Sequence, residues 1–155
     1  MGLRDNLLSD AVRALRVFDP ATIGLDGTVS GAIEAMKERG VGCVVIADRG
    51  RPSGVFTERD VLTKVLAKSI ALDTPIVDVM TSPPQVLREG CSVAEVIRTM
   101  HSGGFRHLPV VDRVGSLVGI VTVTQIVEYL VEHFPSAVFN LPPDAECRPV
   151  AREGA

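Results

Sequence analysis

The fold is decided by the stretch Gly54-Val55-Phe56-Thr57-Glu58-Arg59-Asp60-Val61-Leu62. The residues before Thr57 are typical of a strand, and the residues after it are typical of a helix. A helix N-terminus presents unpaired backbone N–H groups and the positive end of the helix dipole. The stretch therefore predicts a corner at Thr57 where an anion or a sugar phosphate can bind.

The same stretch returns as Gly119-Ile120-Val121-Thr122-Val123, which indicates an internal repeat. After one inserted residue, Gly54 matches Gly119 and Thr57 matches Thr122. Further matches occur upstream at an offset of 64 residues: Val29 with Val93, Ile33 with Ile97, Met36 with Met100, Gly40 with Gly104 and Asp48 with Asp112. A unit of roughly 50 residues has only a marginal core on its own. The repeat therefore predicts two pseudo-symmetric units that pack through their sheets.

Each unit is expected to run strand, helix, strand, strand, helix, which gives an α/β (α+β) fold. Thr28 and Gly40 bound the first helix, and the last helix of the first unit is expected over 58–68. Apolar residues at helical spacing predict one N-terminal helix from Leu3 to Val17. The expected domains are this helix in 1–19, the first repeat in 20–69, a linker helix and loop in 70–84, the second repeat in 85–134, and a partly disordered proline-rich tail in 135–155.

Composition narrows the class of protein. The chain has 155 residues, 46% of them hydrophobic, and a net charge of −3. These values are ordinary for a globular protein and argue against a nucleic-acid partner. No apolar run approaches the roughly 18 residues that cross a bilayer, and the N-terminus does not resemble a secretion signal. Cys43, Cys91 and Cys147 are odd in number and widely spaced, which predicts reduced thiols in the cytoplasm and no metal site.

Together these motifs resemble a cystathionine β-synthase (CBS) domain pair. The residues that carry the resemblance are Gly54 to Asp60, Arg106-His107-Leu108-Pro109-Val110-Val111-Asp112, and Gly119 to Thr122. The resemblance covers roughly residues 19–133. It implies a stand-alone regulatory protein that binds an adenosyl ligand between two sheets, and dimers of pairs that form a flat disc.

The first corner allows two interpretations. Thr57 and Asp60 can form a capping box, which stabilises a helix by about 1 kcal/mol and implies no ligand. The resemblance implies instead that Asp60 accepts both ribose hydroxyls and that Thr57 contacts the ribose or the phosphate. At the second corner, Thr122 is retained but Gln125 replaces the aspartate. A neutral amide binds a hydroxyl more weakly than a carboxylate, so a second nucleotide site is less favoured.

Arg106 and His107 show the opposite asymmetry, because their counterparts in the first repeat are Gly42 and Cys43. They can be a surface arginine and a half-buried histidine that close a strand. The resemblance implies that they face the phosphates, and a protonated His107 would then strengthen binding below roughly pH 6.5. By the same analogy Ile23 and the backbone of Gly42 and Cys43 flank the adenine. One composite site per chain is the resulting prediction.

The preferred hypothesis is a non-catalytic, cytoplasmic sensor that binds an adenine nucleotide as ligand and uses no catalytic cofactor. The alternative is a homodimeric interaction module whose cleft stays empty. An enzyme with His107 as general base is a weaker third hypothesis, because no activated nucleophile accompanies that histidine. Apolar residues on the helices, such as Leu62 and Leu66, predict a homodimer in either case. A further protein partner is possible under both hypotheses.

Overall fold

The computed structural model describes residues 2–135, which form two α/β units with the predicted element order. The first unit comprises β1 (Ala21–Ile23), α2 (Val29–Arg39), β2 (Cys43–Asp48), β3 (Arg51–Thr57), and a last helix that begins as α3 (Glu58–Asp60) and continues as η2 (Val61–Leu66). The second unit comprises β4 (Leu87–Arg88), α4 (Val93–Gly103), β5 (His107–Val111), β6 (Leu117–Thr122) and α5 (Val123–His133). The fold class and the internal repeat are confirmed.

Each unit has one three-stranded sheet, in the orders β1-β2-β3 and β4-β5-β6. The first strand of each sheet is parallel to the second, and the second is antiparallel to the third. The registers are equivalent, since Cys43 pairs with Thr57 as His107 pairs with Thr122. Both sheets also shift register late in the middle strand, after Ile46 and after Val110. The repeat therefore extends to the backbone pairing.

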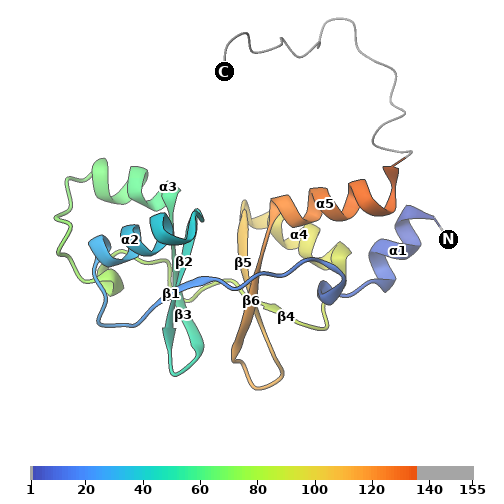
Figure 1. Ribbon diagram of the computed structural model, residues 1–155, viewed down its shortest axis with the longest axis horizontal. Coiled ribbons are helices and arrows are strands. Elements are labelled where there is room, and N and C mark those ends of the chain that lie inside the picture. The colour runs from blue at the N-terminus through green and yellow to red at the C-terminus, as the bar shows by residue number, and fades with distance from the viewer. Residues whose placement is uncertain (1, 136–155) are drawn as a thin grey trace, which may run out of the picture.

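The two sheets face each other at the centre of the molecule, and the helices lie on the outside (Figure 1). Cys43, Val45 and Ile120 are buried between the sheets, and Phe18, Val55 and Leu117 pack against them. The opposite sheet faces pack on the helices of their own unit, around Phe56 in the first unit and Leu108 in the second. A strand covered on both faces is apolar throughout, as Cys43 to Ile46 are in β2.

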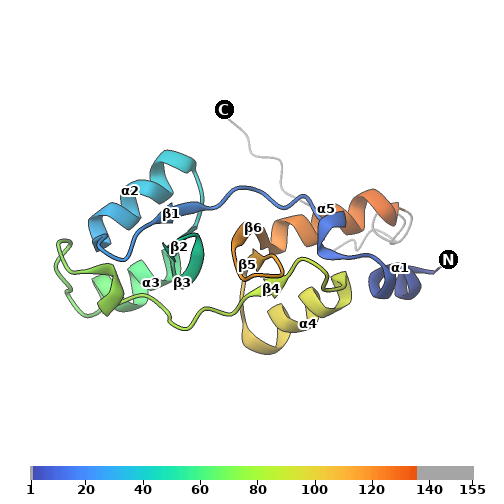
Figure 2. The ribbon, with the colours of Figure 1, turned by 90° about the horizontal axis from the view of Figure 1, so that it is seen from below.

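Two crossing segments, residues 15–20 and 79–86, tie the units together along opposite sides (Figure 2). The first precedes β1 but pairs with the second unit: the N–H of Ile120 donates to the carbonyl of Phe18 over 3.0 Å. The second precedes β4 but pairs with the first unit: the N–H of Thr81 donates to the carbonyl of Val55 over 2.9 Å. Each unit thus completes the edge of the other.

Gly54 and Gly119 make these crossings possible. A Cβ atom on Gly54 would lie 2.4 Å from the sulfur of Met80, and one on Gly119 would lie 2.1 Å from a side-chain carbon of Val17. Neither distance is sterically tolerable without movement of the neighbouring side chain. The two glycines of the repeated stretch therefore serve close packing of the crossing segments.

The prediction of one N-terminal helix from Leu3 to Val17 is wrong. The helix α1 spans Leu3–Ser9, and after it the chain pairs with the second unit and makes a 3₁₀ turn, η1 (Val12–Ala14). The N–H of Val12 donates to the carbonyl of Cys91, and the hydroxyl of Tyr129 donates to the carboxylate of Asp10. Pairing with the second unit replaces the helical hydrogen bonds and buries Val12 and Leu15 in its core.

Other boundaries differ by smaller amounts. The last helix of the first unit was expected as one α-helix over 58–68, but η2 has π-helical hydrogen bonding and ends at Leu66. The linker helix expected within 70–84 is a 3₁₀ turn, η3 (Ile76–Asp78). The predicted tail, including Cys147, lies outside the described residues from position 136 onward. Within residues 2–135, no helix has the length and apolar character needed to cross a bilayer.

Candidate functional site

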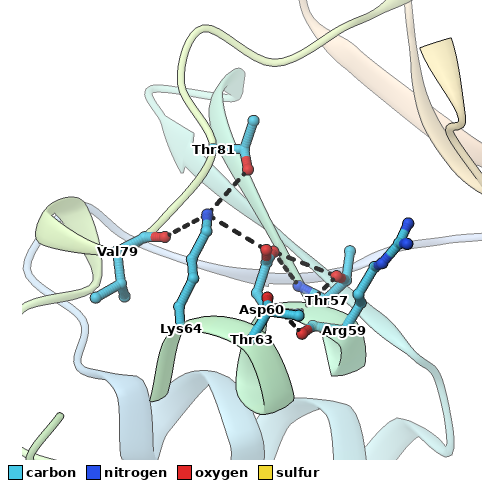
Figure 3. Close-up of polar contacts among 7 residues, drawn as sticks. All are labelled: Thr57, Arg59, Asp60, Thr63, Lys64, Val79 and Thr81. Atoms are coloured by element: carbon cyan, nitrogen blue, oxygen red, sulfur yellow. Dashed lines mark hydrogen bonds and ion pairs between the residues drawn. The ribbon is translucent and has the colours of Figure 1, made fainter. Parts of the chain in front are cut away.

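Thr57 is the N-cap of the helix that begins at Glu58, and its side chain is engaged with Asp60 (Figure 3). The N–H of Thr57 donates to Oδ2 of Asp60 over 3.0 Å, and the hydroxyl of Thr57 donates to the same oxygen over 3.2 Å. In return the N–H of Asp60 donates to the threonine oxygen over 3.3 Å. The capping box considered from the sequence is therefore present, and it fixes the position of the carboxylate.

Lys64 contacts the other oxygen of this carboxylate. Its ammonium lies 3.3 Å from Oδ1 of Asp60, and it donates to the carbonyl of Val79 over 2.9 Å and to the hydroxyl of Thr81 over 3.2 Å (Figure 3). Lys64 was not among the site residues predicted from the sequence. The available signal was a lysine four residues after an aspartate on a helix, a spacing that brings the two side chains together.

Arg106 and His107 come from the second unit, at the start of β5. The backbone carbonyl of Arg106 accepts the N–H of Val123, as the carbonyl of Gly42 accepts that of Glu58 in the first unit. The Arg106 side chain is exposed and has no ion-pair partner within residues 2–135. His107 is half-buried, and this burial lowers the pKa of its imidazole below the usual 6.5, against an opposing effect of Glu58.

These residues meet in one cleft of about 530 Å³. The first unit contributes Thr57 and Asp60 to its lining, and the second contributes Arg106 and His107. The remaining lining residues are Val55, Glu58, Arg59, Leu62, Thr81, Gly103, Gly104 and Phe105. The juxtaposition of an acid from one repeat with a cation from the other, which the sequence predicted, is present.

The other four predicted residues do not line this cleft. Cys43 is buried between the sheets, and this burial raises the pKa of its thiol to about 12. Ile23 pairs with Ile46 in the first sheet. A Cβ atom on Gly42 would lie 3.0 Å from a carboxylate oxygen of Glu58 and 3.6 Å from Nε2 of His107, so Gly42 lies close behind the cleft. The role of these residues beside an adenine stays a prediction.

The second corner, at Thr122, has fewer polar groups that could bind a ribose than the first corner has. The N–H of Thr122 donates to the side-chain oxygen of Gln125 over 2.8 Å, which completes a capping box without a charge. The crossing-segment residue that pairs here is Phe18, whereas the first corner receives Thr81. The two corners have the same backbone arrangement, but only the first has the carboxylate of Asp60 and the hydroxyl of Thr81.

Little in the described residues suggests other chemistry. No group of three or more His, Cys, Asp or Glu side chains in residues 2–135 could hold a metal ion. The described thiols, Cys43 and Cys91, are both free. The groups that the cleft does bring together are a carboxylate, which can accept hydrogen bonds from hydroxyls, and a guanidinium, which can bind an anion.

Comparison with known proteins gives the family. The model of the CBS domain family matches residues 9–67 and 76–132, that is, once in each repeat. A CBS domain-containing protein of Arabidopsis thaliana is 30% identical over 128 residues, which make up 80% of this chain and 23% of that protein. The chain spans less than half the length of this and other curated relatives that it matches.

Solved structures show the same fold. A CBS domain protein from Pyrobaculum aerophilum complexed with AMP aligns with a TM-score of 0.68 and 24% identity, over 81% of this chain and 93% of that chain. The cytosolic domain of the Mg²⁺ channel MgtE in complex with ATP aligns with a TM-score of 0.67 and 26% identity, over 77% of this chain and 48% of that chain. The repeat, the paired sheets and the family match agree: this chain belongs to the CBS domain family and contains a tandem pair of CBS domains.

Proposed function

We propose that this CBS pair is a non-catalytic regulatory module that binds one adenine nucleotide, such as AMP, ADP or ATP, in the cleft between its repeats. The observation that carries the proposal is the composite lining, with Asp60 from one repeat and Arg106 from the other. Arg59 of the first repeat also lines the cleft, but Asp60 and Arg106 belong to different repeats. A ligand that touches both would therefore respond to the relative position of the two repeats, as a sensor requires.

The groups in the cleft suit the two ends of a nucleotide. A carboxylate such as that of Asp60 can accept two hydrogen bonds side by side from the hydroxyls of a ribose. An arginine fork such as that of Arg106 can bind a phosphate through two parallel hydrogen bonds. The volume of about 530 Å³ lies within the range that small-molecule sites usually have, roughly 300–1,000 Å³.

The structural neighbours support the same class of ligand. The Pyrobaculum protein is complexed with AMP and the MgtE domain with ATP, so the fold accommodates adenine nucleotides in other members. CBS pairs are in general regulatory modules, which favours binding over catalysis here. The buried, protonated thiol of Cys43 offers no nucleophile, and free thiols fit the proposed cytoplasmic location.

The direct test is isothermal titration calorimetry of the purified protein with AMP, ATP, adenosine and GMP. We expect saturable binding of at least one adenine ligand with one site per chain, and no comparable binding of GMP. Absence of heat and of any thermal shift with every adenine ligand would favour the alternative, an interaction module whose cleft stays empty.

We further propose that the protein is a homodimer. The last helix of each repeat exposes one pair of apolar side chains. In the first repeat Leu62 is 62% exposed and Leu66 is 63% exposed. In the second repeat Val123 is 43% exposed and Val127 is 53% exposed. Large side chains at this spacing on equivalent helices form two apolar faces that a second copy can cover.

The dimer can be checked by light scattering at micromolar concentration. We expect the mass of two chains for the wild type and of one chain for the double variant Leu66→Glu/Val127→Glu, because two buried carboxylates per chain disfavour the interface. Val114→Glu is the matched control, since Val114 is equally exposed but lies in the β5–β6 turn. A wild-type monomer would contradict the proposal.

A further inference from the structure

We propose that Lys64 is a positioning residue of the ribose site, and that it joins this site to the crossing segment 79–86. The inference rests on the proposed function, because it concerns the same cleft. It follows from three contacts of one ammonium group, which together connect Asp60 with the chain between the two repeats (Figure 3).

The ammonium of Lys64 has no capacity left for a ligand. It carries three protons, and it has three oxygen partners: Oδ1 of Asp60 at 3.3 Å, the carbonyl of Val79 at 2.9 Å and the hydroxyl of Thr81 at 3.2 Å. Its side chain is 30% exposed, so these contacts are only partly screened by water. Lys64 is therefore not one more cation for the phosphate, and its role must act through the groups it holds.

Asp60 keeps room for a ribose while Lys64 stays in place. Each carboxylate oxygen has two lone pairs. Oδ1 uses one for Lys64, and Oδ2 accepts both the N–H and the hydroxyl of Thr57. The hydroxyl proton of Thr57 can rotate away, which leaves one acceptor on each oxygen. Two adjacent acceptors are what two neighbouring ribose hydroxyls require, so the ligand need not displace Lys64.

Thr81 makes the lysine important for the shape of the cleft. This residue lines the cleft and is paired in both directions with Val55, over 2.9 and 3.1 Å. Its side chain has Lys64 as a hydrogen-bond partner. Lys64 thus holds one wall of the cleft and the ribose acid at a fixed separation. Binding at Asp60 and docking of the crossing segment should then favour each other, since such coupling is reciprocal.

The first experiment measures adenosine binding by calorimetry. Lys64→Met keeps the length of the side chain but removes the ammonium, and we expect roughly a fivefold loss of affinity, which is the scale of one partly exposed ion pair. Lys68→Met is the matched control: Lys68 is exposed, follows the same helix and has no ion pair within residues 2–135, so its loss should leave affinity unchanged. Unchanged or tighter binding by Lys64→Met would overturn the proposal.

A double-mutant cycle separates action through Asp60 from a general effect. In the background of Asp60→Asn, Lys64→Met should cause little further loss, because the charge that the lysine positions is already gone. The loss should also be smaller for 2′-deoxyadenosine than for adenosine. Equal losses in both backgrounds and for both ligands would show that Lys64 acts elsewhere, and would overturn the ribose role.

Hydrogen exchange tests the second half of the proposal without ligand. In Lys64→Met the amides of Val55 and Thr81 should exchange faster than in the wild type, while the amides in the middle of β2 should not change. Unchanged exchange at Val55 and Thr81 would overturn the link to the crossing segment.

If the wild type binds no adenine ligand at all, the proposed function fails, and the ribose role of Lys64 fails with it. If the wild type binds and only the lysine results are negative, the proposed function stands alone.

Discussion

Asp60→Asn should weaken adenosine binding by about 1.5–3 kcal/mol, or roughly tenfold to a hundredfold. The carboxylate is the only acidic side chain of the Thr57 corner that is held by both a capping box and a lysine, and it is 14% exposed. Asparagine retains a side-chain oxygen for the N–H of Thr57, so the helix keeps its cap. What it loses is the charge and one of the two acceptors that face the ribose.

Calorimetry with adenosine and 2′-deoxyadenosine measures this effect. The deoxy ligand should bind the wild type more weakly and should lose less on mutation, because it has one hydroxyl fewer to donate. Gln125→Ala is the matched control, since Gln125 occupies the equivalent position at the second corner. Equal losses from both substitutions would contradict a single site at the first corner.

The sequence was sufficient for those parts of the fold that depend on local signals. Caps and stops are local: Thr28 accepts the N–H of Gly31, and Gly40 adopts a left-handed φ of 62°. Each was predicted from residue type and spacing. The internal repeat predicted the overall architecture, because equivalent residues in two units are expected to form equivalent elements and equivalent cores.

The errors occur where one unit completes the other. Residues 10–15 have helical apolar spacing, but pairing with the second unit overrides that propensity. Gly54 was correctly predicted in a strand, but the close approach of Met80 from the crossing segment, which its lack of a side chain permits, was not predicted. Contacts between residues this far apart in sequence leave no periodic pattern in a single chain.

The site shows the same division. The chemistry of Asp60 and Arg106 could be predicted, since each belongs to a motif, and the asymmetry between the repeats indicated that they share one cleft. The wall formed by Thr81 and its tie to Lys64 could not, because the crossing segment has no motif of its own. The motifs therefore predicted that Asp60 and Arg106 line one cleft, but not the wall that Thr81 forms.

The second large effect is expected for the phosphate end. Arg106→Ala should weaken AMP binding by about 1.5–3 kcal/mol, the range for a hydrogen bond to a charged group, and should leave adenosine binding nearly unchanged. The side chain of Arg106 is exposed and lines the cleft, so its attraction for phosphate is screened by ions. Added salt should therefore reduce the AMP affinity of the wild type and have little effect on the variant. Arg113→Ala, in the β5–β6 turn, is the control.

The pH dependence separates Arg106 from its neighbour. Burial lowers the pKa of His107 below 6.5, so the ring is neutral in the free protein at neutral pH, and the expectation of a rise in affinity near pH 6.5 shifts to more acidic conditions. Protonated His107 would favour phosphate, so its contribution is present below its pKa and lost as the pH rises through it. Between roughly pH 7 and 8 the cations that line the cleft are Arg59 and Arg106, and the AMP affinity should be flat there. If calorimetry shows that Arg106→Ala weakens AMP and adenosine equally at pH 7.5, Arg106 is a structural residue and the composite site is refuted.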